Sequence, residues 1–387
     1  MAPRLGRGAA RFAVLLLGTV LLLGAVLLLG AVLLLGAVLL LGAVLLLGRS
    51  AARYDRRMTE STEVRTDRHP LTAAGSVELA VLERSGFDES RHVGAGVVVD
   101  ASGAVLDAVG DPTASIYPRS TMKPFQALAI RRAGALFSGP ELVMTTASHA
   151  GTPSHQSLAE HMLASFDHVE DDLGCPPDMP FDRATAQTMT GPRRLAMNCS
   201  GKHAGMLAAC RVNGWDEATY LDIAHPLQQL VRSTVEDATG EVVDVVGTDG
   251  CGAPVFPLTL TGLARGLAGF VQRSDADTAA LTDAVLANAW AIDGVGRANT
   301  VTIERLGLVA KLGAEGVMVM AVPGGAAVVV KVLDGALRAG TLAALTLLQR
   351  NGLVPTDGVA DVLQATGEKV LGGGVPVGSV RVGDGLR

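Results

Sequence analysis

Cysteine is scarce in this sequence. Its 387 residues include only four, Cys175, Cys199, Cys210 and Cys251, and none forms a CxxC motif. So few cysteines exclude the disulfide scaffold of a small secreted protein. We therefore expect reduced thiols in a cytoplasmic enzyme, with metal binding as the next possibility.

Basic residues are also scarce beyond the amino terminus. Residues 1–57 carry seven arginines and one acid, whereas residues 58–387 carry 25 basic and 37 acidic residues, a net charge near −12. No basic stripe is visible in this acidic body, which argues against a nucleic-acid partner. Hydrophobic residues make up 49% of the chain, enough for a sizeable core, and this excludes a disordered protein.

One long apolar run stands at the amino terminus. Residues 12–48 carry no charge and repeat the hexamer Gly-Ala-Val-Leu-Leu-Leu. A membrane span needs about 20 apolar residues, so this run is too long for one helix and too short for two with a turn. Three interpretations stay open: a membrane anchor or uncleaved signal, a cleavable secretory signal, or a low-complexity extension outside the native protein.

A polar segment follows this run and sets the expected domain boundary. From Met58 the sequence MTESTEVRTDRHP is typical of an ordinary amino terminus. We therefore predict a hydrophobic low-complexity segment at residues 1–57, as an anchor or a non-native extension, and one catalytic domain at residues 58–387.

Two valine-rich hairpins and several helices are expected in the body. Residues 94–109 contain two strand-like runs separated by a turn that ends at Gly103, and residues 317–322 and 326–333 are separated by Pro-Gly-Gly. Helical periodicity and stop signals predict further elements between and after the hairpins. They are helices at 120–134, 203–213, 225–238, 256–271 and 276–291, and a closing helix at 338–350.

This order of elements predicts the fold class. Strands lie near both ends of the body and helices fill its middle. Such an order favours an α/β (α+β) fold: one antiparallel sheet, assembled from distant parts of the chain and covered by helices, with a helical sub-lobe.

The pattern Ser120-x-x-Lys123 is the first candidate for chemistry. On a helix beginning at Ser120, residues three apart lie on the same face, so the lysine amine approaches the serine oxygen. A serine needs a neighbouring base to become a nucleophile, and a lysine serves only if burial or nearby cations lower its pKa. Arg119 is a plausible contributor. A solvated lysine after a helix cap is the alternative.

Two later features strengthen the pattern. Penicillin-recognising serine enzymes combine S-x-x-K with a downstream S-D-N and a K-T-G on a strand. Here Ser148-His149-Ala150 and Lys311-Leu312-Gly313 follow in the same order. The His149-Ala150 and Leu312 positions depart from that pattern, which speaks against a lactam-binding site.

Six blocks around these residues carry a closer resemblance. They include Arg-Ser-Thr-Met-Lys-Pro-Phe-Gln and Asn-Cys-Ser-Gly-Lys-His, and they resemble the rhizobial-type (class 3) L-asparaginase II family. The resemblance extends from about Val77 to the carboxyl end. The blocks are residues 89–94, 119–126, 147–151, 198–205, 249–254 and 311–316.

The resemblance implies a β-lactamase/glutaminase-like fold and hydrolysis of L-asparagine to L-aspartate and ammonia. Ser120 would be the nucleophile with Lys123 as its base, and Ser148 with Lys311 would form a second pair that relays protons. The substrate-binding residues implied are Arg119, His149, His203 and Asp249, of which Asp249 would hold the substrate's α-amino group.

The resemblance also implies a zinc ion bound by Cys199, Lys202 and Cys251. Chemistry alone gives a weak signal, since the two cysteines are far apart in sequence and lysine must be neutral to coordinate. Three ordinary buried side chains are the alternative. Cys175 and Cys210 match no such role, and we interpret Cys210 as part of the core.

Rival functions stay open at this point. A penicillin-binding or β-lactamase-like hydrolase, a glutaminase, and a binding protein that has lost its chemistry are the alternatives. A homodimer is expected from the base rate for enzymes of this size. Contact with a membrane is expected only if residues 12–48 are expressed. His155 is interpreted as a surface histidine that caps a helix.

Overall fold

An antiparallel sheet of eight strands organises the part of the chain that the structure describes. The computed structural model describes residues 68–387, which cluster as one unit. The predicted low-complexity segment and the boundary at Met58 lie outside the described residues. The strands run in the order β11-β12-β1-β2-β10-β9-β8, and β3 pairs with β2. Their bounds are β1 Val77–Arg84, β2 Phe87–Val99, β3 Val105–Val109, β8 Val309–Gly313, β9 Val317–Val322, β10 Ala326–Val332, β11 Val370–Gly372 and β12 Val375–Val382.

The centre of this sheet is buried on both faces. Val97, Val98 and Val99 of β2 are 0% exposed, so this part of the strand is continuously apolar rather than alternating. Strand β10 pairs with it from Ala327 opposite Val99 to Val332 opposite Gly94. A Cβ on Gly94 would lie 2.0 Å from the Lys331 carbonyl oxygen, so only glycine fits where these strands meet.

Both predicted hairpins are confirmed. Strands β2 and β3 are joined by a turn in which Gly103 has φ +81°, while an Asp100 carboxylate oxygen accepts from the Ser102 and Ala104 amides. Strands β9 and β10 are joined through Gly324 and Gly325, both with positive φ. The conformations that glycine permits therefore end these strands where the sequence predicted.

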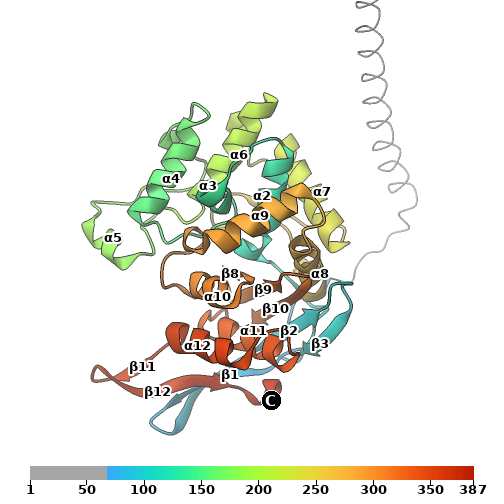
Figure 1. Cartoon of the computed structure of the whole chain (residues 1–387), viewed down its shortest axis with the longest axis vertical. Helices are drawn as coiled ribbons and strands as arrows, with labels where there is room; N and C mark the ends of the chain where they lie inside the picture. The colour runs from blue at the N-terminus through green and yellow to red at the C-terminus, as the bar shows by residue number, and fades with distance from the viewer. Residues whose placement is uncertain (1–67) are drawn as a thin grey trace, which may run out of the picture. The chain divides into compact units, whose positions relative to one another are not determined.

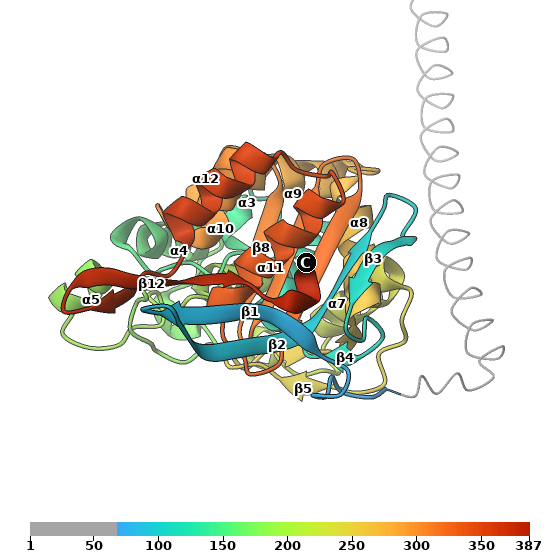
Figure 2. The same ribbon diagram turned by 90° about the horizontal axis from the view of Figure 1, so that it is seen from below.

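Helices cover both faces of the sheet. Figure 1 shows α11 (Arg338–Arg350) and α12 (Thr356–Thr366) on one side of β8–β10, with α8 (Leu260–Val271) on the other. Both α8 and α11 contact β2 and β10, and α7 packs on α8 as the first layer of the helical lobe. Figure 2 shows α11 lying across the sheet. The predicted class, an antiparallel sheet covered by helices with a helical sub-lobe, is confirmed.

The helical lobe is built from the middle of the chain. Its main helices are α2 Lys123–Arg132, α3 Gly139–Met144, α4 Pro153–Ala164, α5 Arg183–Thr188, α6 Ser200–Asn213, α7 Pro226–Thr239, α9 Ala276–Ala287 and α10 Ala298–Leu306. Two small antiparallel pairs accompany them: β4 Ser115–Ile116 with β7 Leu258–Thr259, and β5 Gly247–Thr248 with β6 Pro254–Val255.

Three of the helix predictions were wrong in part. The helix expected from Ser120 begins with a 3₁₀ turn, Arg119–Met122, before α2. The helix expected from residue 256 starts at Leu260, because Thr259 pairs in β7 and its hydroxyl accepts from the Gly262 amide at 2.9 Å. The helix at 338–350 has the predicted bounds but does not close the chain, since α12, β11 and β12 follow it.

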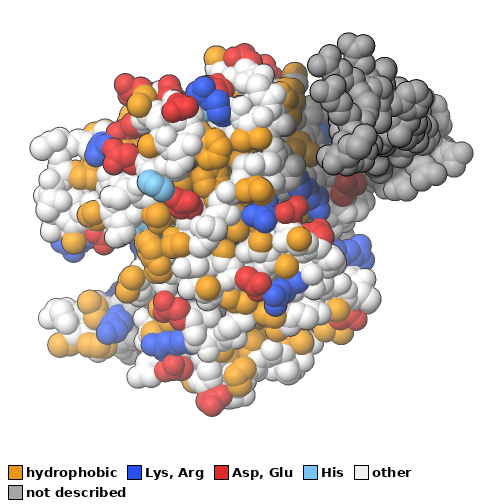
Figure 3. Space-filling model, turned by 45° about the horizontal axis from the view of Figure 1, so that its top comes forward, with side chains coloured by type: hydrophobic (Ala, Val, Ile, Leu, Met, Phe, Trp, Pro, Cys, Tyr) orange, Lys and Arg blue, Asp and Glu red, His pale blue; other side chains and the backbone are white. Residues whose placement is uncertain are grey.

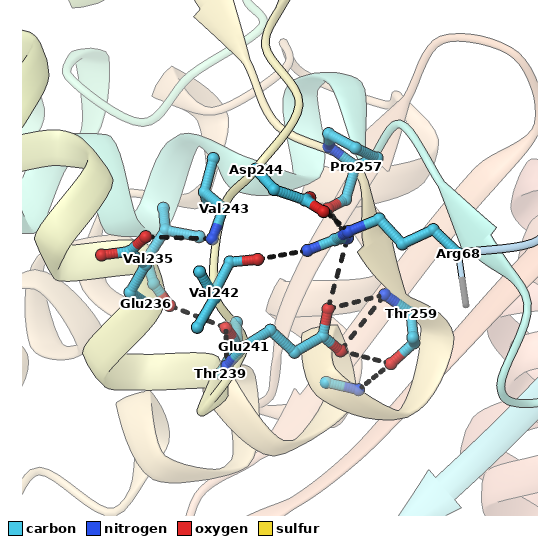
Figure 4. A network of polar contacts seen from close by, with 11 residues as sticks. Arg68, Val235, Glu236, Thr239, Glu241, Val242, Val243, Asp244, Pro257 and Thr259 are labelled. Carbon is cyan, nitrogen blue, oxygen red and sulfur yellow. Dashed lines mark hydrogen bonds and ion pairs between the residues drawn. The ribbon is translucent and has the colours of Figure 1, made fainter. Parts of the chain in front are cut away.

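A polar network fixes the start of α8 (Figure 4). The Glu241 carboxylate accepts from the Thr259 amide at 3.2 Å and from its hydroxyl, and lies 3.7 Å from the Arg68 guanidinium. Arg68 also donates to the Pro257 carbonyl at 2.5 Å and pairs with Asp244 at 2.7 Å. The carboxylate thus provides acceptors where the first turn of a helix leaves amides without intrahelical partners.

The surface of residues 68–387 is mixed in charge. On the face shown in Figure 3, Lys and Arg side chains alternate with Asp and Glu side chains. None of the helices described in residues 68–387 combines the length and the apolar character that a membrane span requires.

Candidate active site

Ser148 lies between two lysine amines. It follows α3 in the loop before α4, Lys123 opens α2, and Lys311 lies on the edge strand β8. The Nζ atoms of Lys123 and Lys311 each donate to Ser148 Oγ at 2.8 Å. Three of the four residues predicted for the two serine–lysine pairs therefore meet at one hydroxyl.

Both amines are removed from solvent. Lys123 is 1% exposed and Lys311 is 0% exposed. Burial, followed by the charge of Lys123, lowers the pKa of Lys311 to about 7, against the opposing effect of Asp293. Lys311 also donates to the Leu312 carbonyl at 2.8 Å, and Lys123 donates to the Ala147 carbonyl. A lysine with such a pKa exchanges protons readily at neutral pH.

Ser120 lies half-buried in the 3₁₀ turn before Lys123. Arg119, at the start of this turn, has φ +53°, a conformation that costs energy for a residue other than glycine and that clusters at functional sites. Within the part of the chain that the structure describes, Ser120 Oγ makes no hydrogen bond, since the Lys123 amine turns to Ala147 and Ser148. The predicted contact between Ser120 and Lys123 is therefore not formed here.

Strand β8 approaches the Ser120 backbone closely. A Cβ on Gly313 would lie 2.7 Å from the Pro118 carbonyl oxygen and 3.4 Å from the Ser120 amide nitrogen. Glycine at this position lets the edge strand and the serine turn come together. The arrangement can bring backbone N–H donors from both elements towards one oxygen atom.

Arg119 and Asp249 form an ion pair beside this turn. The guanidinium Nε donates to Asp249 Oδ1 at 2.6 Å, and the Gly250 amide donates to the same oxygen at 2.9 Å. Both contacts use Oδ1, which leaves Oδ2 for a further donor. A cavity of about 290 Å³ opens next to the pair and is lined by Tyr117, Arg119, Gly247, Thr248 and Val255.

His149 and His155 form a buried stack. Their ring centroids are 5.0 Å apart. His149 is bonded to Ser200 Oγ at 2.9 Å and accepts from the Gly151 amide at 3.2 Å, so neither ring nitrogen is free for a substrate. Burial lowers the pKa of both histidines, most strongly that of His149.

The interpretation of His155 as a surface cap was wrong. The side chain is 1% exposed and is bonded to Thr152 Oγ1 at 2.7 Å and to the Trp290 carbonyl at 3.2 Å. Thr152 is the residue that caps α4. Sequence spacing gave no sign of the stacking partner, because His149 lies outside the helix.

The residues predicted to bind zinc gather at the start of α6. The Lys202 amine donates to Cys251 Sγ at 3.1 Å, and Cys199 donates to Asn198 Oδ1 at 2.8 Å. All three predicted ligands are buried. His203 lies beside them: its Nδ1 is bonded to Tyr220 Oη at 2.6 Å, and its side chain interacts with the Cys251 thiol.

The pKa values of the two thiols in this cluster are shifted in opposite directions. The contact with Cys199, and then the charge of Lys202, hold the pKa of Cys251 far below its usual range. The same contact, and then burial, raise the pKa of Cys199. Burial opposes the charge of Lys202, but Cys251 and Cys199 raise its pKa overall. Burial also lowers the pKa of His203.

The cluster fits a thiophilic metal ion in chemistry. Two sulfur donors and an amine are adjacent and shielded from water. Residues 68–387 contain no group of three or more His, Cys, Asp or Glu side chains arranged to hold a metal. A site here therefore depends on Lys202 as its third ligand.

Sequence reasoning missed Tyr220. Its hydroxyl contacts His203 and accepts from the Gly174 amide at 2.8 Å, and its side chain borders a cavity of about 520 Å³. No pattern in the sequence marks Tyr220, because its partner, His203, lies on α6.

Cys175 and Cys210 are buried and free, and burial raises the pKa of their thiols to about 11 and about 12.

Comparisons with known proteins identify the family. Among solved structures, a β-lactamase from Mycobacterium bovis aligns with 66% of this chain and 94% of its own, at 16% identity and a TM-score of 0.37. Mglu in its glutamate form aligns with 68% of this chain and 62% of its own, at 12% identity and a TM-score of 0.31. A search of curated proteins found no match.

The family model for L-asparaginase II matches residues 80–382, which include every residue of the candidate site. The chain therefore belongs to the L-asparaginase II family and is an amidohydrolase that converts L-asparagine to L-aspartate and ammonia.

Proposed function

We propose that this enzyme hydrolyses asparagine through two serine–lysine pairs, Ser120 with Lys123 and Ser148 with Lys311. The observation that carries the proposal is the position of Ser148 Oγ, held at 2.8 Å by two buried amines. An amine that has lost its proton can activate a hydroxyl, and a hydroxyl between two amines can pass a proton from one to the other.

The first half of the reaction forms an acyl-enzyme. Ser120 Oγ attacks the side-chain amide carbon of asparagine, and its proton passes to Lys123. The negative charge that builds on the carbonyl oxygen is stabilised by N–H groups of the serine turn and of strand β8, close together at Gly313. Loss of one such donor costs about 3–4 kcal/mol in other enzymes.

The second half releases the products. The leaving nitrogen takes a proton from Ser148, which Lys123 resupplies with the proton that it took from Ser120, and departs as ammonia. Water then attacks the acyl carbon and gives a proton through Ser148 to the neutral amine of Lys311. As the intermediate collapses, this proton returns through Ser148 and Lys123 to the Ser120 oxygen, and aspartate is freed. This sequence returns every group to its starting state.

Three further residues would line the substrate site, and His149 would support it. We assign the α-amino group of asparagine to Asp249 Oδ2, which neither Arg119 nor Gly250 occupies. Arg119 would orient this carboxylate, and its charge would face the α-carboxylate of the substrate. His203 would line the site beside Cys251. His149, whose ring nitrogens are both occupied, would support the site from behind through Ser200.

Zinc is proposed as the metal of the thiol and amine cluster. Cys199, Lys202 and Cys251 would hold it, and Lys202 would have to give up its proton to coordinate. When bound, the ion supplies a fixed positive charge that shapes the pocket. We assign it no role in making hydroxide.

Paired serine variants test the nucleophile. Ser120→Ala should lower the kcat for asparagine by at least about 10³-fold, as for removal of other catalytic nucleophiles. In acid-quenched samples taken during turnover, Ser148→Ala should still form an acyl-enzyme on residue 120, detectable as an added mass on the peptide that contains it. If Ser120→Ala kept most of its ammonia release, or if the acyl group of the wild-type enzyme were found on residue 148, the assignment would be overturned.

Metal analysis tests the zinc site. Protein carrying Cys251→Ala should retain less than about a tenth of the zinc bound by the wild type, because a structural site rarely survives the loss of one thiolate. Cys210→Ala is the matched control, since Cys210 is a buried thiol away from the cluster. Equal zinc contents in wild type and Cys251→Ala would remove Cys251 from the ligand set.

Two broader expectations are also part of the proposal. A cytoplasmic location is supported by four free, buried cysteines, which suit a reducing compartment. A homodimer is supported by the frequency of two-fold assemblies among enzymes. Cell fractionation and sedimentation of the full chain measure these two properties.

A further inference from the structure

Residues 292–299 connect the two halves of the second serine–lysine pair. On one side the Ser148 amide donates to the Ile292 carbonyl at 3.0 Å, and the Ala150 amide donates to the Asp293 carbonyl at 2.6 Å. On the other side Asn299 Oδ1 accepts from the Leu312 amide at 2.9 Å. The segment therefore contacts the loop of Ser148 and the strand of Lys311 at the same time.

The contacts close into a ring. Lys311 Nζ donates to Ser148 Oγ and to the Leu312 carbonyl, both at 2.8 Å. Asp293 Oδ2 accepts from the Asn299 amide at 3.4 Å, so the segment is tied across its own ends. In order, the ring of hydrogen bonds passes from the Ser148 loop to residues 292–293, then to Asn299, Leu312 and Lys311, and from Lys311 back to Ser148.

The segment is built to keep this geometry. Asp293 and Asn299 are 3% and 2% exposed, and the Arg297 guanidinium donates to Asp293 Oδ1 at 2.5 Å. Gly294 has φ +139°, and a Cβ there would lie 3.1 Å from the Cβ of Ala150. Only glycine therefore allows the segment to approach the Ser148 loop this closely.

The side chain of Asn299 makes a contact that the sheet does not provide. Among the strands that the structure describes, β8 is the last on its side of the sheet, so no neighbouring strand offers an acceptor to the Leu312 amide. Asn299, in the first turn of α10, supplies that acceptor. A shift of this strand would move the Leu312 carbonyl, and with it the amine of Lys311.

From this ring we propose that Asn299 is a positioning residue for amide hydrolysis: by holding strand β8 at Leu312, it keeps the Lys311 amine against the Ser148 hydroxyl. The inference rests on the proposed function, because it assumes that this pair transfers protons during catalysis. Asp293 supports the same arrangement by accepting from the Asn299 amide.

Two substitutions of Asn299 separate positioning from simple stability. Asn299→Leu removes the acceptor at similar size and should lower the kcat for asparagine about 10- to 100-fold, since misplacements near 1 Å have such effects. KM should change less than about threefold, because Asp249 and Arg119 are untouched. A crystal structure of this variant should show Lys311 Nζ and Ser148 Oγ farther apart than 2.8 Å.

Asn299→Asp keeps the acceptor and adds a charge near Lys311. This variant should keep kcat at alkaline pH within about fivefold of the wild type. The apparent pKa at which its kcat falls on the acid side should rise by about one unit, because a carboxylate favours the protonated amine. The charged or titratable groups already acting on Lys311 are Lys123, Asp293, Cys199 and Arg297. The added charge acts on Lys311 whatever the role of Asn299, so it is the retained kcat of Asn299→Asp, set against the loss in Asn299→Leu, that shows the need for the acceptor.

A matched control and the opposing outcomes complete the test. Asn351→Leu removes amide contacts to Asp107 and to the Leu347 carbonyl, away from the site, and should leave kcat unchanged. A folded Asn299→Leu protein with wild-type kcat, or with the 2.8 Å contact intact, overturns the proposal. If Asn299→Leu does not fold, a loss of kcat beyond about fivefold at alkaline pH in Asn299→Asp, which keeps the acceptor, overturns it. Full activity of Ser148→Ala would instead refute the proposed function.

Discussion

A lysine acts as a base only after it loses its proton, so the microscopic environment of each amine decides what the site can do. Lys311 is fully buried, and the side chain of Lys123 lies against the same hydroxyl. Both effects disfavour its charged form and bring its pKa to about 7. The site therefore holds one amine that is about half deprotonated at neutral pH.

This state of Lys311 predicts the pH dependence of turnover. Below a pH of about 7 the amine is protonated and cannot accept a proton, so kcat for asparagine should rise with pH through an apparent pKa of about 7 and level off above it. The profile is measured as ammonia release between pH 5 and pH 9. A kcat that is constant from pH 5 to pH 7 would contradict this role.

Arginine substitutions test the same point. Lys311→Arg places a permanent charge in the site and should lower kcat by at least about 10³-fold, since arginine does not deprotonate in proteins. Lys331→Arg is the control, because Lys331 is a partly buried lysine of β10 whose amine binds only backbone carbonyls. It should keep kcat within about twofold.

The sequence predicted residues that the structure brings together, Lys123, Ser148 and Lys311, but it did not predict their contacts. The blocks around Ser120, Ser148 and Lys311 pointed to the right family. The three-residue spacing of Ser120 and Lys123 suggested a direct contact, yet the long lysine side chain reaches Ser148 instead. Spacing describes neighbours along one helix, whereas this contact joins α2 to a loop 25 residues away.

At the scale of elements, the junction of strand β8 with the serine turn is the most demanding feature. The strand carries Lys311, and Gly313 lies against the turn that carries Ser120. Any side chain at Gly313 must push the two elements apart, because the nearest atoms, the Pro118 carbonyl oxygen and the Thr121 methyl carbon, lie 2.7 and 3.1 Å from the added Cβ.

Gly313→Ala should therefore impair catalysis more than stability. We expect a loss of kcat of about 10²- to 10³-fold, equivalent to one misplaced oxyanion donor, with the free energy of unfolding reduced by about 1–3 kcal/mol from overpacking. Activity assays and urea unfolding measure the two effects. Gly269→Ala in α8, where an added Cβ meets nothing within 4 Å, is the control and should gain about 0.5–1 kcal/mol. Wild-type kcat in Gly313→Ala would contradict the arrangement.

Elements with strong local signals were predicted well, and elements that depend on distant partners were not. The valine hairpins and the helices stopped by Gly214 and Gly240 match the structure, since both glycines adopt left-handed caps. Strand β12 was missed because its sequence VPVGSVRV contains a proline and a glycine and stays half-exposed. Its glycine, Gly378, lies where a Cβ would be 1.9 Å from the Glu83 carbonyl oxygen, a constraint visible only after pairing.

On the scale of the whole molecule, the sheet joins segments that are far apart in sequence. Strand β1 lies between β2, its neighbour in sequence, and β12, which ends near the carboxyl terminus. The sequence predicted that the strands lie near both ends of the body, but it did not predict their order in the sheet. Which strand from one end pairs with which from the other depends on packing that local patterns do not encode.

Removing residues 368–387 tests how much the final hairpin stabilises this sheet. The deletion takes away β11 and β12 and exposes the edge of β1 from Ala80 to Arg84, which pairs with Val382 to Gly378 in the intact protein. Backbone hydrogen bonds contribute about 1 kcal/mol each, so the truncated chain should lose several kcal/mol, a large part of the usual 5–15 kcal/mol.

The exposed edge should also change how the truncated protein behaves in solution. The middle of β1 is apolar, with Leu79, Ala80 and Val81 at 0% exposure, and an unpaired apolar edge is a template for aggregation. Arg381→Met is the control: it removes a surface ion pair with Asp88, and solvent-exposed pairs of this kind contribute little to stability. Urea unfolding and light scattering measure both effects. Strand β2 lies next to β1 and carries the centre of the core, so loss of β12 should be felt there. A soluble truncated enzyme with full stability would contradict this expectation. It would show that the helices, rather than this end of the sheet, stabilise the site.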